Sequence, residues 1–236
     1  MFEVRELSFT YRNDKILRDI SFTVSPGETV AIVGANGAGK TTLLKILATL
    51  FYPDSGMVLS DGHEAFAHPM KYRRQLGYLP EQVSLYDDMT AKEYLKYRAQ
   101  LKGEPAKRVR RRVSEAAELC KIGELLDLAI GRLSLGQKKR IALADALMLR
   151  PKVLLLDDLL NGLDYSMREA IGEILSEATN FTSVVLTGHE INDMAGWADK
   201  FFVLREGVLS EPIVDEQNDK DAYAQKVYAA LAGGGR

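Results

Sequence analysis

Residues 30–44 read Val-Ala-Ile-Val-Gly-Ala-Asn-Gly-Ala-Gly-Lys-Thr-Thr-Leu-Leu, and this stretch decides the fold. Four apolar residues predict a buried strand, a glycine-rich turn follows, and an apolar pattern with helical spacing begins at Lys40. The turn has the spacing G-x-x-x-x-G-K-[ST] of a phosphate-binding loop. Because a strand precedes the turn and a helix follows it, we expect a nucleotide-binding site here.

Each residue type in this turn has a chemical reason to be there. Glycines let several backbone N–H groups approach one anion, since a Cβ atom would block the approach. The helix that follows adds the partial positive charge of its amino end. Lys40 is expected to reach the β- and γ-phosphates, and Thr41 to ligate Mg²⁺. The predicted phosphate-binding residues are Gly34, Ala35, Asn36, Gly37, Ala38, Gly39, Lys40, Thr41 and Thr42.

Length and composition limit the possible classes of protein. The 236 residues suit one large domain or two small lobes. The 33 acidic and 31 basic residues nearly balance, so bulk charge predicts no attraction to nucleic acid or to a membrane surface. A single cysteine, Cys120, excludes an internal disulfide and is typical of a reducing compartment. No apolar run approaches the roughly 20 residues that span a bilayer, so neither a signal peptide nor direct membrane insertion is expected.

The order of predicted elements indicates an α/β fold with a helical insert. From residue 87 to 149 the pattern is typical of helices alone: one that the capping box Thr90-Ala91-Lys92-Glu93 opens and that ends at Leu101, a second at 106–119 and a third at about 135–149. On either side, strands alternate with helices, and three C-terminal glycines predict a loose end. We therefore expect a mixed sheet with flanking helices, an antiparallel β lobe, and one domain over 1–236, divided into a core lobe (about 1–86 and 151–236) and a helical subdomain (about 87–150). The other predicted elements are strands at 2–9, 16–24, 57–59, 77–79, 153–157 and 183–187, helices at 40–50, 166–178, 191–198 and 221–231, and a hairpin at 201–208.

Three further features have ordinary structural explanations. His63 and His68 have no acidic or cysteine partners at ligand spacing, so they are interpreted as surface histidines. The basic run at 107–112 lacks interleaved aromatic residues and is interpreted as a solvated helix face rather than a nucleic-acid surface. Tyr11 lies between the first two strands, where a turn aromatic is the simpler interpretation and a stacking face for a purine base is the alternative.

A second chemical motif is the stretch Val153-Leu154-Leu155-Leu156-Asp157. It predicts a buried strand that delivers a carboxylate at its carboxyl end, where α/β sheets bind ligands. Asp157 is placed to hold Mg²⁺, and Asp158 to orient an attacking water molecule. Two aspartates could merely open a loop, but the phosphate loop upstream favours the functional interpretation.

With these motifs the sequence resembles the ATPase subunits of ATP-binding cassette transporters over residues 2 to about 210. Leu133-Ser134-Leu135-Gly136-Gln137 is similar to the family signature L-S-G-G-Q except at its third position. Gln82 matches the family's glutamine loop, and Asn161-Gly162-Leu163-Asp164 its dimer-contact loop. His189 matches the switch histidine, and Tyr11 takes the position of the adenine-stacking aromatic, which reverses the simpler interpretation above.

The resemblance implies ATP and Mg²⁺ as ligands and hydrolysis by Asp158, His189, Gln82 and Lys40. It implies metal contacts from Thr41, Gln82 and Asp157. Ser134 and Gly136, at the start of a helix whose free N–H groups form an anion site, would meet the γ-phosphate held by a second ATPase subunit, identical or not. Further implied are a multispanning membrane permease as partner, and a cytoplasmic location at the inner face of the cell membrane. The segment 85–95 looks more like exporters than importers.

Several residues depart from the family pattern. Asp158 stands where the family has Glu and is shorter by one bond of about 1.5 Å, which predicts slow turnover. Leu159-Leu160 replaces Pro-Thr, with apolar bulk expected at the dimer-facing turn. Leu135 replaces a glycine, and Gly188 replaces a threonine.

Three function classes therefore stand open. The leading one is an ATPase subunit that powers a transporter, most simply an exporter. The second is a slowly hydrolysing ATP clamp, regulatory or one half of an asymmetric pair, because of Asp158. The third is a soluble cassette protein of translation or DNA repair, which would carry two cassettes or a long coiled-coil insert that this chain lacks.

Overall fold

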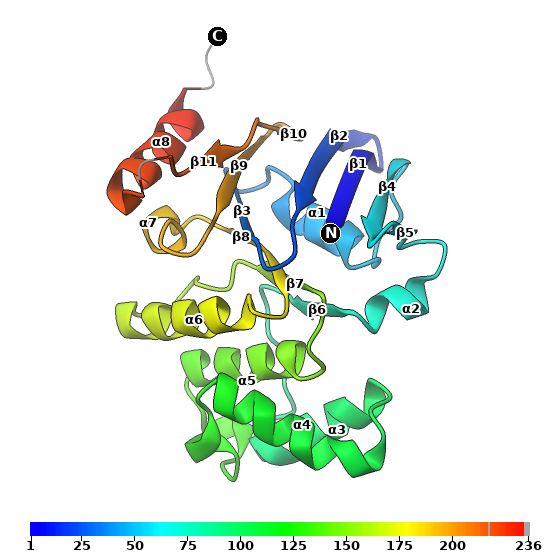
Figure 1. The fold of residues 1–236 in the computed structure, drawn as a ribbon, viewed down its shortest axis with the longest axis vertical. Helices are drawn as coiled ribbons and strands as arrows, with labels where there is room; N and C mark the ends of the chain where they lie inside the picture. Colours follow the sequence, from blue (N-terminus) through cyan, green and yellow to red (C-terminus); the bar gives the residue numbers. More distant parts are fainter. Residues whose placement is uncertain (217, 234–236) are drawn as a thin grey trace.

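The computed structural model describes residues 1–216 and 218–233 as two β-sheets with helices packed around them (Figure 1). The smaller sheet is antiparallel and has the strand order β2-β1-β4-β5. The larger sheet has the order β10-β9-β3-β8-β7-β6, with β11 beside β9, and β9, β3, β8, β7 and β6 run parallel. The strands are β1 (Phe2–Tyr11), β2 (Asp14–Val24), β3 (Thr29–Val33), β4 (Ser55–Ser60), β5 (His63–Glu64), β6 (Leu76–Leu79), β7 (Val153–Asp157), β8 (Ser183–Gly188), β9 (Lys200–Arg205), β10 (Val208–Leu209) and β11 (Ile213–Val214).

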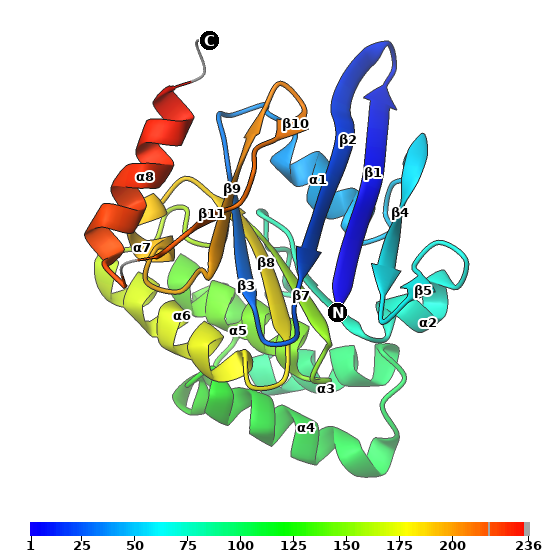
Figure 2. The ribbon, with the colours of Figure 1, turned by 45° about the horizontal axis from the view of Figure 1, so that its top comes forward.

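The apolar run of β3 is explained by burial on both faces of the larger sheet. Val30 and Ile32 face one core, which they share with α1 (Lys40–Leu47) and the antiparallel sheet. Ala31 and Val33 face the other core, on the side of the remaining large helices. A parallel strand covered on both faces reads as a continuous apolar run, as this one does. Figure 2 shows α1 between the two sheets and α5 and α6 on the opposite side of the larger one.

The helical insert forms its own packed group at one end of the molecule (Figure 1). It comprises α3 (Ala91–Leu101), α4 (Ala106–Leu119) and α5 (Leu135–Leu147), which pack on one another, with short 3₁₀ turns at Gly123–Leu125 and Ile130–Arg132. The predicted capping box opens α3: Thr90 accepts from the backbone of Glu93, whose side chain accepts from the backbone N–H of Thr90. The expected α/β fold with an antiparallel lobe and a helical insert is therefore confirmed.

The remaining helices are α2 (Pro69–Arg73), α6 (Tyr165–Ala178), α7 (Ile191–Met194) and α8 (Lys220–Ala232). The predicted helix at 191–198 is too long, since α7 ends at Met194 and the hydrogen bonds from there to Ala198 are a mixture of bonds to acceptors three and four residues back. The helix predicted at 40–50 ends at Leu47 because Thr49 adopts the left-handed region, with φ 56°. The helix α2 and the short strands β5 and β11 were not predicted. The loose end expected at Gly234 and Gly235 lies outside the described residues. Within the described ranges, no helix has both the length and the apolar character to cross a bilayer.

Candidate nucleotide site

The phosphate loop joins β3 to α1 with the backbone that its glycines require. Gly37 and Gly39 have φ angles of 80° and 107°, a region that side chains with a Cβ rarely adopt. Gly34 is required for a different reason, because a Cβ there would lie 2.3 Å from the carbonyl oxygen of Leu204. Ala35, Asn36 and Gly37 form the exposed crest of the loop, while Ala38, Thr41 and Thr42 are half-buried. The loop thus exposes its crest next to the amino end of α1, a place where helix N–H groups favour an anion.

Lys40 lies across this loop rather than out in solvent. Its Nζ donates to the carbonyls of Gly34 at 2.7 Å and Ala35 at 3.0 Å. Burial lowers the pKa of Lys40, and the charges of Asp158, Asp157 and Glu81 act against that fall. A partly desolvated ammonium facing an open anion cradle is suited to bind a phosphate oxygen.

Asp157 ends β7 beside the loop and has the chemistry of a magnesium ligand. Its Oδ1 accepts from the hydroxyls of Thr41 at 3.1 Å and Thr187 at 2.8 Å. Its Oδ2 is buried and has no hydrogen-bond partner among the described residues, so one carboxylate oxygen is free for a cation. No cluster of three or more His, Cys, Asp or Glu side chains suited to a metal occurs in the described ranges. Mg²⁺ fits such a site, since it takes one or two protein oxygens and completes its shell with water and substrate phosphates.

Replacing Asp157 by asparagine is expected to stabilise the nucleotide-free protein at neutral pH. Burial is the largest cause that raises the pKa of this carboxyl above 3.8. The folded state therefore disfavours the ionised form, so Asp157 costs stability as the pH rises above that value. We expect Asp157→Asn to raise Tm at pH 7.5 by roughly 2–4 °C, the shift that about 1 kcal/mol gives in a domain of this size. The gain should shrink as the pH falls toward 3.8.

Thermal unfolding in EDTA across this pH range measures the effect. Asp61→Asn is a control of opposite sign, because a hydrogen bond from Lys152 is the first cause that holds the pKa of Asp61 at about 2. A loss of stability at pH 7.5 for Asp157→Asn would contradict the assignment of Asp157 as a buried carboxylate that destabilises the protein until it binds a cation.

Asp158 and His189 come together from two neighbouring strands. Asp158 follows β7 and His189 follows β8, and His189 Nδ1 lies 3.3 Å from Asp158 Oδ1. Asp158 adopts the left-handed region with φ 46°, which Asp tolerates better than most residues. Its backbone N–H donates to the carbonyl of Thr187, which fixes the turn against β8. Gly188 leaves room here, because a Cβ on it would lie 3.6 Å from Asp158 Oδ1.

The structure does not bring Tyr11 and Gln82 into this hydrogen-bonded group. Tyr11 ends β1 with an exposed ring, and the guanidinium carbon of Arg12 lies 5.7 Å from the ring centroid. Gln82 is exposed in the loop that follows β6. Both side chains are free to turn toward a ligand, and their predicted roles stay predictions.

The signature segment lies at the amino end of α5. Ser134 is the N-cap: its Oγ accepts from the backbone of Gln137, whose side chain accepts from the backbone N–H of Ser134. Ser134 is exposed, Gly136 is buried, and a Cβ on Gly136 would lie 2.9 Å from Met167. Leu135 is 53% exposed, and a Cβ on Gly162 would lie 3.2 Å from its Cδ2. The leucine that departs from the family pattern therefore lies beside the segment Asn161–Asp164.

The expectation of apolar bulk at that turn is wrong for Leu159 and Leu160. Both side chains are buried, at 3% and 4% exposure, and they join the core beneath the larger sheet. The left-handed backbone at Asp158 turns the chain so that these leucines point inward. Their apolar character therefore contributes to packing rather than to an outer surface.

Two polar residues at this site escaped the prediction from sequence. Thr187 lies opposite Asp157 in the register of β7 and β8 and donates to its Oδ1. The signal available was a threonine near the end of a strand predicted to be parallel to the aspartate strand. Lys139 is buried, and its Nζ donates to the carbonyls of Leu159 at 2.8 Å and Asn161 at 2.6 Å. Helical spacing places it on the buried stripe of α5 with Gly136 and Leu143, which was the available signal.

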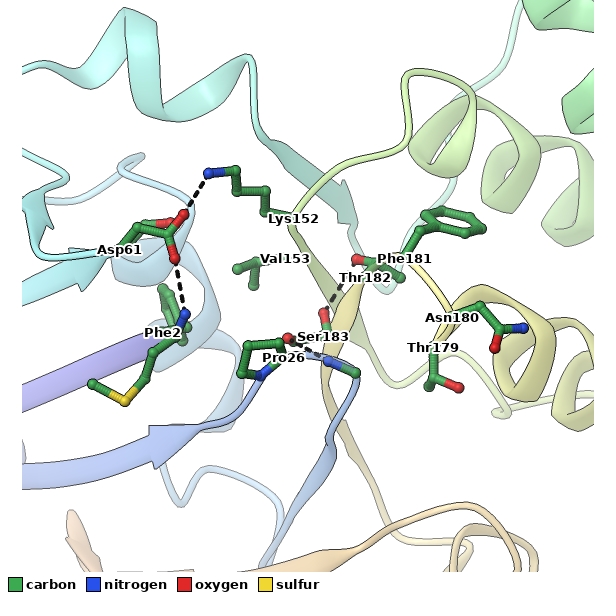
Figure 3. Close-up of a pocket in the computed structure, with 13 residues that line it drawn as sticks. Phe2, Pro26, Asp61, Lys152, Val153, Thr179, Asn180, Phe181, Thr182 and Ser183 are labelled. Carbon is green, nitrogen blue, oxygen red and sulfur yellow. Dashed lines mark hydrogen bonds and ion pairs between the residues drawn. The ribbon is translucent and has the colours of Figure 1, made fainter.

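A pocket of about 410 Å³ lies elsewhere, where Met1 and Phe2 face the chain segments that lead into β3, β7 and β8 (Figure 3). Its charged groups are already paired, since Asp61 binds both Lys152 and the amino group of Met1. Ser183 Oγ donates to the carbonyl of Ser25 at 2.8 Å. The nucleotide motifs lie at the opposite, carboxyl ends of these strands, so this pocket is not part of the site.

Together, the fold and these residues define a phosphate-loop ATPase. A profile of the family described as "ABC transporter" matches residues 17–161. The chain is 32% identical over 210 residues to the uncharacterized ABC transporter ATP-binding protein YxlF of Bacillus subtilis strain 168, covering 89% of this chain and 70% of YxlF. It is 30% identical to the SkfA peptide export ATP-binding protein SkfE of the same strain, covering 99% and 97% of the two chains. It is 31% identical to the spermidine/putrescine import ATP-binding protein PotA of Haemophilus influenzae over 89% of this chain, but it spans only 57% of PotA.

Solved structures of ATP-binding cassettes are also similar to this chain. The dimeric post-hydrolysis cassette MJ0796 bound to ADP and Pi superposes with a TM-score of 0.81 at 25% identity, covering 91% of this chain and 98% of that one. The cbiO1 subunit of the cbiONQ transporter complex from Clostridium perfringens gives 0.84 at 29% identity, covering 97% and 92%. The chain belongs to the ABC transporter family as an ATP-binding subunit. Its activity is ATP hydrolysis, and it binds ATP with Mg²⁺.

Proposed function

We propose that this chain dimerises around ATP and Mg²⁺ and drives a transporter, in the direction of export, from the cytoplasmic face of the cell membrane. The observation that carries the proposal is the convergence of Lys40, Asp157, Asp158 and His189 at the carboxyl ends of β3, β7 and β8. Lys40 would bind phosphate, and Asp157 would offer its free oxygen to Mg²⁺. The carboxylate of Asp158 and the imidazole of His189 lie together beside them. This set suits hydrolysis of a terminal phosphate.

The remaining predicted residues complete the proposal. Tyr11 would stack on the adenine, and the loop residues 34–42 would hold the phosphates. Gln82 would contact the metal and the nucleotide, and Asp158 and His189 would orient and activate the attacking water. We propose one ATPase domain over 1–236, with a core lobe of about 1–86 and 151–236 and a helical subdomain of about 87–150.

The need for a second subunit follows from where the two anion sites lie. The loop is carried by α1, which packs on β7, whereas Ser134 is carried by α5, which packs on α3, α4, α6 and β6. The loop crest and Ser134 are both exposed, so each resembles half of a site. The dimeric cassette MJ0796 supports a second ATPase subunit, and the cbiONQ complex supports a membrane permease.

Export is favoured over import by the extent of the match to each kind of relative. The peptide-export protein SkfE aligns over 97% of its own length, whereas the chain spans 57% of PotA and 62% of the sulfate/thiosulfate import protein CysA of Methylococcus capsulatus. The importers therefore carry long segments with no counterpart in the alignment, and the exporter does not.

Untargeted mass spectrometry of cells and of their medium tests the direction of transport. Cells that carry the Lys40→Met variant are compared with cells that carry the normal chain and with cells that carry Lys45→Met. In an exporter, the cargo accumulates inside Lys40→Met cells and falls in the medium. The opposite redistribution would show import, and no redistribution, together with co-purification with ribosomes, would indicate a soluble cassette protein.

A further inference from the structure

Lys139 is an unusual feature of the signature helix because it is a buried cation. The side chain is 4% exposed and lies on the stripe of α5 that faces the core. A lysine is rarely this buried without a compensating partner, because removing an ammonium from water is costly. Something specific must therefore hold the charge in place.

The compensation comes from the turn that follows Asp158. Lys139 Nζ donates to the main-chain carbonyls of Leu159 at 2.8 Å and Asn161 at 2.6 Å. Burial lowers the pKa of Lys139, and the charges of Asp158 and Glu81 act against that fall. One ammonium thus joins the helical insert to the turn beside the carboxylate proposed to activate water.

The turn itself has an irregular backbone that needs such support. Asp158 and Gly162 both adopt the left-handed region, with φ angles of 46° and 73°, on either side of the two carbonyls. The other main-chain bonds of the turn run from Asp158 to Thr187 of β8, from Asn161 to Asp158 and from Leu163 to Leu160. These bonds do not reach α5, so the lysine fixes the turn against that helix in a way that they cannot.

We propose that Lys139 is a positioning residue that holds the 158–161 turn, and with it the Asp158 carboxylate, in register with the signature helix. The inference rests on the proposed role of Asp158 in hydrolysis. Lys139 lies five residues after Ser134 on one rigid helix, so a displacement of the Ser134 end is transmitted to the carbonyls beside Asp158. Misplacement of a catalytic group by about 1 Å costs on the order of a hundredfold in rate.

The test separates kcat from nucleotide binding in the full chain. Lys139→Met keeps the apolar part of the side chain, which ends at Cε, but removes the ammonium and its donors. We expect kcat for ATP to fall about tenfold or more, while KM and the affinity for a fluorescent ATP analogue stay within about threefold. Lys139→Gln, which is one bond of about 1.5 Å shorter, should show the same split, and it carries the test if the methionine variant fails to fold.

Lys102→Met is the matched control. Lys102 is another poorly exposed lysine that contacts α5, where its Nζ donates to Asp145, and Asp145 keeps Arg98 as a partner when Lys102 is lost. We expect this variant to lower Tm without changing kcat. A folded Lys139 variant with the kcat of the normal chain would overturn the inference. So would a parallel loss of kcat and nucleotide affinity, since that is the signature of a general structural role.

Asp158→Asn, measured alongside, distinguishes the two possible failures. If Asp158→Asn keeps the full kcat, the proposed role of Asp158 is wrong and the inference falls with it. If Asp158→Asn is inactive and the Lys139 variants match the normal chain, only the role of Lys139 is wrong.

Discussion

Replacing Lys40 by methionine is expected to lower kcat for ATP by roughly 100- to 1,000-fold, the usual effect of removing one donor aimed at developing charge. The Nζ that donates to Gly34 and Ala35 is the cation of the loop, and no other lysine lies between residues 30 and 44. Nucleotide affinity should fall as well, because the charge contacts phosphate before and during the reaction. Phosphate release and titration with a fluorescent nucleotide measure the two effects.

Lys45→Met is the control for this variant. Lys45 lies in the last turn of the same helix, with its Nζ 5.6 Å from the centroid of the Phe51 ring. We expect its kcat to stay within about threefold of the normal value, since its half-buried side chain packs over Phe51 rather than on the phosphate loop. A Lys40→Met protein that hydrolyses ATP like the Lys45→Met protein would remove the basis for the phosphate-loop assignment.

Asp158 should respond in opposite directions to two substitutions. Asp158→Asn removes the base and should lower kcat by about 100-fold or more. Asp158→Glu adds one bond of about 1.5 Å toward the attacking water and should raise kcat by about tenfold. The left-handed backbone suits glutamate less well than aspartate, so Tm should fall by a few degrees while kcat rises.

Single-turnover hydrolysis and thermal unfolding on the same preparations check this pair. A brisk rate that neither substitution alters would refute the idea that Asp158 limits turnover. If Asp158→Asn is inactive and Asp158→Glu does not raise kcat, the chain fits a slowly hydrolysing ATP clamp, or the degenerate half of a heterodimer, better than a fully active ATPase subunit.

Much of the fold was predictable because local patterns and packing agree. The apolar run 30–33, the glycine spacing and the Thr90 capping box each predict one structure, and the structure has it. Asp157 and Asp158 could also be placed, since a buried strand that ends in a carboxylate delivers it to the ligand-binding edge.

What sequence could not provide were contacts between distant segments. The inward turn of Leu159 and Leu160 depends on the left-handed backbone at Asp158. No local sequence pattern predicts that backbone conformation. Lys139 looks like one more charge in the run Lys138-Lys139-Arg140 until α5 is packed against the 158–161 turn. The pairing of Thr187 with Asp157 depends on the register of β7 against β8.

The central claim is that ATP joins two copies of the site, the loop of one to the Ser134 helix end of the other. Sedimentation velocity of the Asp158→Asn protein tests it most directly, because blocked hydrolysis preserves the bridging phosphate. We expect a 26.2 kDa monomer without nucleotide and a dimer with MgATP. We also expect that adding Ser134→Glu, whose charge repels phosphate, restores the monomer. A monomer in MgATP, both alone and mixed with the subunit that copurifies with it, would contradict the account.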